Sequence, residues 1–142
     1  MQRLRLLLIV AALGVLAGCA TQSVSHAPGT ELGNLKTFYV QKLAADQRGI
    51  EQLFVKQLNA WGYTATAGAA EKPATPVDAI VTYQDRWAWD ITMYMIRLNV
   101  QIRDAQTGAI VANAESMRPS LERRDPPEMV KEVLQAALKR PQ

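Results

Sequence analysis

Apolar side chains recur at helical spacing in two stretches of the chain. In the first, residues 46–62, the apolar positions lie three or four residues apart, at Ile50, Leu53, Phe54, Leu58 and Trp61. This spacing predicts an amphipathic helix that buries one stripe of side chains. Asp46 is expected to cap the start of the helix, and Gly62 stands where a left-handed residue ends it.

The second stretch, residues 125–140, predicts the last helix of the fold. Its apolar stripe consists of Met129, Val130, Val133, Leu134, Ala137 and Leu138. Asp125 is expected at the N-cap, Pro126 suits the first helical position, and Glu128 stands at the capping-box spacing.

Three further stretches have the character of strands. Residues 36–41 are a short run of aromatic and β-branched residues, whereas residues 77–83 and 94–102 carry apolar side chains at alternate positions. Such patterns are typical of strands with one buried face. Residues 64–76 are small, contain proline and lack a period, which predicts a surface loop that begins, at most, with a short edge strand.

A hairpin follows from matching the apolar rows of the last two stretches. The register that places both rows on one face pairs Tyr83 with Ile96, Val81 with Leu98, and Ala79 with Val100. It puts the turn at Trp89–Asp90 or one residue wider on each side. A slip of one residue would expose a whole apolar row, so we expect this register to be firm.

A second hairpin is predicted around "RDAQTGAIV", with Gly108 in a left-handed conformation at the turn. The matching register places Ile102 opposite Ile110, Val100 opposite Ala112, and Leu98 opposite Ala114. Arg97 then lies beside Glu115 on the other face, an opposite-charge pair that supports the register.

These elements predict an α+β fold in the order strand, helix, strand, strand, strand, helix. We expect a mainly antiparallel four-stranded sheet with both helices on one face, because this arrangement buries both helical stripes and one face of the sheet. The helix after the first strand allows that strand to pair in parallel with a later one.

The start of the chain has the order of a secretory signal. "MQRLR" is basic, "LLLIVAALGVLA" is apolar, and "AGC" supplies small residues before Cys19. The apolar run is shorter than the roughly 20 residues that span a bilayer. We therefore expect residues 1–18 to be a cleaved signal peptide, residues 19–34 a flexible tether rich in small and polar residues, and residues 35–142 the folded domain.

The string "LAGC" resembles the lipobox of bacterial lipoproteins. The resemblance implies recognition of Leu16, Ala17 and Gly18 by the signal peptidase, and lipidation of Cys19. It also implies that Ala20, in place of aspartate, directs export to the periplasmic face of the outer membrane. With the "DAQTG" turn and the order of elements, the chain resembles small proteobacterial outer-membrane lipoproteins of unknown function.

Charge and composition narrow the functional classes. The chain has 16 basic and 13 acidic residues, a net charge of +3. Loss of Arg3 and Arg5 with the signal leaves about +1, which gives no support to nucleic-acid binding. The single histidine, His26, lies in the expected tether, and no metal, phosphate or cofactor motif occurs. Asp85 and Asp90 could form a carboxylate pair, but solvated turn charges are favoured, so we expect no enzyme, no metal and no cofactor beyond the lipid on Cys19.

Aromatic and charged residues are most concentrated in "YQDRWAWDITMYM", residues 83–95. We interpret its bend as an interaction surface for an envelope protein or for peptidoglycan, made by Arg86, Trp87, Trp89, Asp90, Met93 and Met95. Met93 and Met95 are expected on the outer sheet face, either open or covered by residues 64–76. Trp89 either folds back over the open end of the core or meets a partner. The alternative function is a hydrophobic-ligand binder with a pocket near Tyr83, Trp87 and Tyr94.

Overall fold

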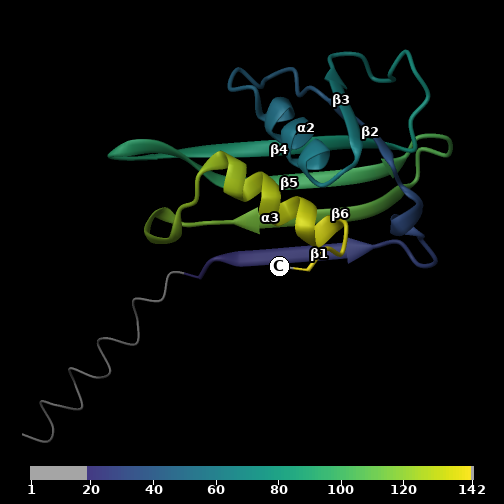
Figure 1. Cartoon of the computed structure of the whole chain (residues 1–142). Helices are drawn as coiled ribbons and strands as arrows, with labels where there is room; N and C mark the ends of the chain where they lie inside the picture. The colour runs from purple at the N-terminus through teal and green to yellow at the C-terminus, as the bar shows by residue number, and fades with distance from the viewer. Residues whose placement is uncertain (1–18, 142) are drawn as a thin grey trace, which may run out of the picture.

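A six-stranded mixed sheet carries two α-helices on one of its faces in the computed structural model, which describes residues 19–141 (Figure 1). The strands are β1 (Thr21–His26), β2 (Thr37–Gln41), β3 (Thr64–Gly68), β4 (Ala79–Asp90), β5 (Thr92–Asp104) and β6 (Ile110–Met117). The helices are α2 (Ile50–Ala60), α3 (Pro126–Ala137) and the short 3-10 turns η1 (Leu32–Asn34) and η2 (Ser120–Glu122). The predicted α+β class is confirmed, but a sheet of four strands is wrong. The expected signal peptide, with Leu16, Ala17 and Gly18, lies outside the described residues.

The sheet has the order β1-β6-β5-β4-β2-β3, and the two strands outside the predicted four, β1 and β3, form its edges. β1 pairs antiparallel with β6, so the expectation of a flexible tether at residues 19–34 is wrong. Its side chains also reach α3, since a His26 ring nitrogen lies 3.0 Å from the carbonyl oxygen of Ala137. Backbone pairing needs no apolar pattern, which explains why a polar segment could form this strand.

The region from β2 to β3 is the predicted parallel crossover. β2 pairs in parallel with β3, to which it is joined through α2, and also with β4. α2 begins later than expected, because Gly49 in the left-handed conformation, and not Asp46, occupies its N-cap position. Gly62 does adopt the expected left-handed conformation, with φ 86°. β3 is the edge strand that was expected, at most, to begin the loop over residues 64–76.

The core lies between the helices and the sheet. Both predicted stripes pack into the core. Phe54 and Leu58 of α2 and Val133 and Leu134 of α3 are shielded completely from solvent, whereas Leu53 and Trp61 are partly buried against the core. Asp125 occupies the N-cap of α3 as expected, although its side chain makes no capping hydrogen bond. Within residues 19–141, neither helix has the length and apolar character needed to cross a bilayer.

The predicted register of the first hairpin is wrong by four residues. Tyr83 pairs with Val100, and Val81 with Ile102. A shift by an even number keeps each side chain on the same face. The row Ala79, Val81 and Tyr83 is therefore buried against the helices as expected, and so are Ile102 and Val100, the partners of Val81 and Tyr83.

A β-bulge breaks this pattern near the end of the hairpin. Arg86 pairs with Arg97 but Trp87 pairs with Met95, which leaves Ile96 as an extra residue in β5. The extra residue turns Met95 towards the core, where it is fully buried. The expectation that Met95 lies on the outer face is therefore wrong, and the predicted core positions of Tyr94 and Ile96 are wrong for the same reason.

The second hairpin is displaced by two residues from its predicted register. Ile102 pairs with Ala112, and Val100 with Ala114. Gly108 has φ 73° at the turn, as predicted. The Asp104 carboxylate accepts hydrogen bonds from the backbone N–H groups of Gln106 and Thr107, which holds the turn and lowers the pKa of Asp104. Arg97 and Glu115 form the expected ion pair, at 3.8 Å, across a diagonal.

Candidate functional site

The β4–β5 hairpin ends in an apolar tip that projects beyond the rest of the sheet (Figure 1). Three large side chains there face solvent, with exposed fractions of 72% for Trp89, 87% for Ile91 and 50% for Met93. We call these three residues the hairpin tip. The turn is centred on Ile91, between the paired Asp90 and Thr92, so the prediction of a turn at Trp89–Asp90 is slightly early.

The backbone at Ile91 is unusual for its residue type. Its φ is 61°, in the left-handed region that β-branched residues rarely adopt. Glycine or asparagine would relieve this strain, and a polar residue would suit the exposure. The turn itself therefore does not explain the isoleucine.

Trp87 closes the open end of the core. It is half-buried, its indole N–H donates a hydrogen bond of 2.6 Å to Asp85, and the Arg48 guanidinium lies 4.2 Å above its ring. Trp89 makes no such return to the core, so the alternative that Trp89 folds back over the open end is wrong. Trp87 therefore packs at the open end of the core, whereas Trp89 lies on the exposed surface of the hairpin tip.

Arg123, between η2 and α3, holds the hairpin end in place. Its guanidinium lies 4.8 Å from the Tyr94 ring centroid and 3.6 Å from the Asp90 carboxylate, and it donates a hydrogen bond to the Thr92 hydroxyl. The Ser120 hydroxyl also donates to Asp90. Asp90 is thus a positioning residue for the hairpin end.

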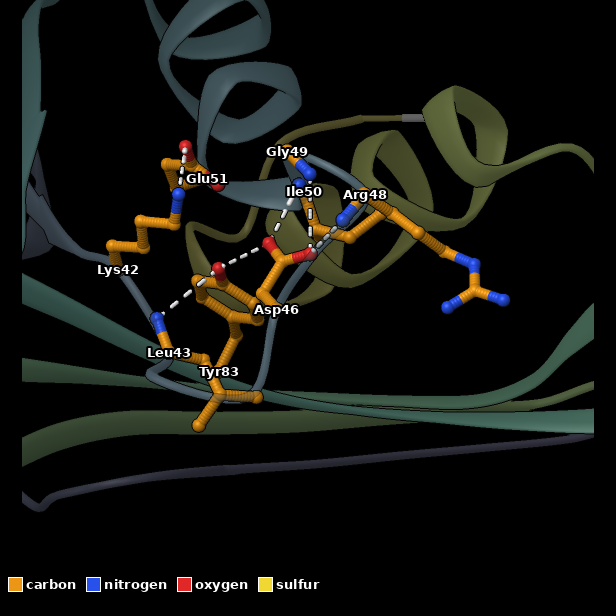
Figure 2. A network of polar contacts seen from close by, with 8 residues as sticks. All are labelled: Lys42, Leu43, Asp46, Arg48, Gly49, Ile50, Glu51 and Tyr83. Atoms are coloured by element: carbon orange, nitrogen blue, oxygen red, sulfur yellow. Dashed lines mark hydrogen bonds and ion pairs between the residues drawn. The ribbon is translucent and has the colours of Figure 1, made fainter.

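Behind the tip, Asp46 anchors the loop that carries Arg48 (Figure 2). Its buried carboxylate accepts hydrogen bonds from the Tyr83 hydroxyl and from the backbone N–H groups of Arg48, Gly49 and Ile50. Burial opposes ionisation, but these hydrogen bonds outweigh it and lower the pKa of Asp46. Burial and the bond to Asp46 raise the pKa of Tyr83.

The remaining predicted site residues are dispersed. Arg86 is exposed and lies opposite Arg97, while Met95 is inside the core. Asp85 and Asp90 bond to different partners, Trp87 and Arg123, so they do not act on a common point. Within residues 19–141 no three histidine, cysteine, aspartate or glutamate side chains gather as metal ligands would.

The space proposed for a hydrophobic ligand is occupied by side chains. Tyr83 is 3% exposed and stacks on Phe54 with ring centroids 5.2 Å apart. A hollow of about 470 Å³ lies at the other end of the sheet, around the β5–β6 turn, and is lined by polar groups that include Gln41, Lys72 and Arg103. A polar hollow does not suit a lipid, so the alternative function gains no support.

Comparison with known proteins shows the fold without assigning a family. No model of a known protein family matches the chain, and no curated protein matches it either. A PelC dodecamer from Paraburkholderia phytofirmans has a TM-score of 0.60 at 16% identity, over 87% of this chain and 100% of that one.

Two other solved structures share the fold. A DUF4136 family protein from Bacteroides thetaiotaomicron has a TM-score of 0.51 at 10% identity, over 82% and 93% of the two chains. A PDZ domain protein from Parabacteroides distasonis has a TM-score of 0.52 at 12% identity, over 86% of this chain and 36% of that one. The architecture is therefore one that occurs in bacterial proteins.

Proposed function

We propose that the protein is a lipid-anchored component of the bacterial cell envelope, held through Cys19 at the periplasmic face of the outer membrane. Its small domain acts as a non-enzymatic interaction module. The lipobox and the signal-like start of the chain support the anchor. An envelope protein or peptidoglycan is the class of partner expected for the module.

The observation that carries the proposal is the hairpin tip. Monomeric proteins bury most large apolar side chains, and contiguous exposed ones mark sites of contact. Trp89 and Ile91 are both largely exposed, on a turn where the left-handed backbone of Ile91 favours another residue. Arg123 fixes this turn to the rest of the domain, so the tip is preorganised for contact.

The anchor is tested by labelling cells with radioactive palmitate. The wild-type protein should be labelled and fractionate with the outer membrane. Cys19→Ser should remain an unlabelled precursor in the inner membrane. Ala20→Asp is the matched control, because it should keep the label and change only the membrane fraction. Label on Cys19→Ser would exclude lipidation at this residue.

The module is tested by photocrosslinking in cells. A photoreactive amino acid at Met93 should give a defined adduct, and the same group at Gln106, in the β5–β6 turn at the other end of the sheet, should not. The adduct should weaken when Trp89→Ser is introduced. Equal labelling from both positions would contradict an interaction surface at the tip.

A further inference from the structure

Exposed apolar side chains are concentrated at one end of the molecule. Within residues 19–141 the large ones are Val24, Trp89, Ile91, Met93, Ile110 and Leu121. Four of these belong to the hairpin tip or to η2, which contacts the tip through the bond from Ser120 to Asp90. Leu121 lies between Ser120 and Arg123, the two residues that contact the hairpin end, and its side chain is 82% exposed.

The strand register places the anchor residue at this same end. Thr21 pairs with Met117, and Met117 pairs with Arg97, so the three lie level across the sheet. Chain direction then carries Cys19, η2 and the hairpin tip beyond this line on the same side. Figure 1 shows the start of β1 and the β4–β5 turn at the same end of the sheet. Cys19 is exposed and stands two residues before β1. Little chain therefore separates a lipid on Cys19 from the fold.

The distances allow the anchor and the tip to touch one surface together. From the rise per residue, the tip extends about 10 Å further along the strands than Cys19. From the strand spacing, it lies about 12 Å away across the sheet. A plane through both points is inclined by roughly 45° to the strands, so a leaning domain brings lipid and tip to one bilayer surface.

The chemistry of the tip suits a lipid surface better than a polar glycan. Tryptophan prefers the membrane–water interface, and isoleucine, methionine and leucine partition into the acyl region. Arg86, exposed on β4 three residues before Trp89, is a cation that can meet lipid phosphates, whereas Arg124 is paired with Glu132 at 3.8 Å.

From these placements we infer that the hairpin tip, together with Leu121, inserts into the membrane leaflet that holds the lipid on Cys19. The inference rests on the lipid anchor of the proposed function, and it names the bilayer, in place of an envelope protein or peptidoglycan, as what this surface contacts. Insertion adds a second point of attachment and fixes the orientation of the domain. The β5–β6 turn and its polar hollow then point away from the membrane.

The test uses the mature lipidated protein in vesicles of phosphatidylethanolamine and phosphatidylglycerol. Ile91→Cys is labelled with an environment-sensitive fluorophore, and Gln106→Cys is the matched control at the opposite end. Nitroxide-labelled lipid should remove about half of the fluorescence at residue 91, with a blue shift, and leave residue 106 unchanged. Trp89→Cys provides a second labelling position if Ile91→Cys folds poorly.

The outcomes separate the inference from the anchor. The protein could float with the vesicles while labels at residues 89 and 91 are as unquenched as the label at residue 106. This result would exclude insertion of the tip and would still support the lipid anchor. If the label at the hairpin tip shows a blue shift but is not quenched by the nitroxide lipid, and copies of the protein crosslink to one another, the tip instead contacts a second copy of the chain. Failure to float would overturn the anchor and the insertion together.

Discussion

The hydroxyl of Tyr83 donates a hydrogen bond of 2.7 Å to the carboxylate of Asp46 (Figure 2). It also accepts one of 3.2 Å from the backbone N–H of Leu43. Two bonds thus attach the loop between β2 and α2 to the middle of β4. Because the same loop carries Arg48 over Trp87, this pair determines how the core is closed behind the hairpin tip.

Tyr83→Phe should destabilise the domain. The change keeps the ring stacked on Phe54 but leaves the buried Asp46 carboxylate without one donor. Loss of a hydrogen bond to a charged group costs about 1.5–3 kcal/mol, which should appear as a lower midpoint in urea denaturation. Tyr94→Phe is the control, since the described residues supply no hydrogen bond to its hydroxyl. Equal midpoints for the two variants would show that the Asp46 contact contributes little.

Asp46 should also make stability depend on acid pH. Its folded-state pKa lies below the ordinary value of 3.8, so its contribution is present above that pH and is lost as the pH falls through the folded-state pKa. The free energy of unfolding of Asp46→Asn should therefore differ most from wild type near neutral pH. The difference should shrink below about pH 4. A constant difference across this range would mean that ionisation of Asp46 is not involved.

Replacing Ile91 by asparagine should increase the stability of the domain, although it removes an apolar side chain from the hairpin tip. Asparagine tolerates the left-handed conformation at φ 61°, so Ile91→Asn should raise the free energy of unfolding by about 1 kcal/mol. Ile110→Asn, on a strand and 44% exposed, is the matched control and should give no gain. Thermal and urea denaturation measure both. Destabilisation by Ile91→Asn would indicate that the side chain packs within the domain.

The helices were predictable because their signals are local. The spacing of Phe54 and Leu58 defines a stripe. Gly62 marks a helix end because glycine tolerates the left-handed backbone, and Asp125 marks a helix start because aspartate is a preferred N-cap residue. The strand faces were also predictable, since parity alone decides whether Val81 or Val100 is buried. The local pattern does not determine which residues of two neighbouring strands pair. Both predicted hairpin registers were therefore wrong by an even number of residues.

The features that build the candidate surface depend on distant contacts. The bulge at Ile96 reverses the faces of Tyr94 and Met95 and has no marker in the sequence. Arg123 meets Asp90 across about thirty residues of chain, and β1 is recruited by pairing with β6. Aromatic density drew the prediction to the hairpin end, but it did not separate Trp87, which closes the core, from Trp89, which is exposed.

Arg123→Ala should loosen the hairpin end. The substitution removes the ion pair to Asp90, the bond to Thr92 and the contact with the Tyr94 ring, at a cost of about 1 kcal/mol. Faster hydrogen exchange at backbone amides of residues 89–94 is the sharper readout. Lys131→Ala, on the exposed side of α3, should leave these amides unchanged. Unaltered exchange in Arg123→Ala would show that the tip is held by the strands alone.

Met93 and Met95 should respond to truncation in opposite ways, although both stand on β5 two residues apart. Met95 is completely buried beyond the bulge, so Met95→Ala should leave a cavity and cost about 2–5 kcal/mol. Met93 is half exposed, so Met93→Ala should change stability by less than about 0.5 kcal/mol. Urea denaturation of the two variants measures the difference directly. Similar small losses of stability in both variants would indicate a regular register without a bulge. Met95 would then lie on the outer face, where it is available for contact.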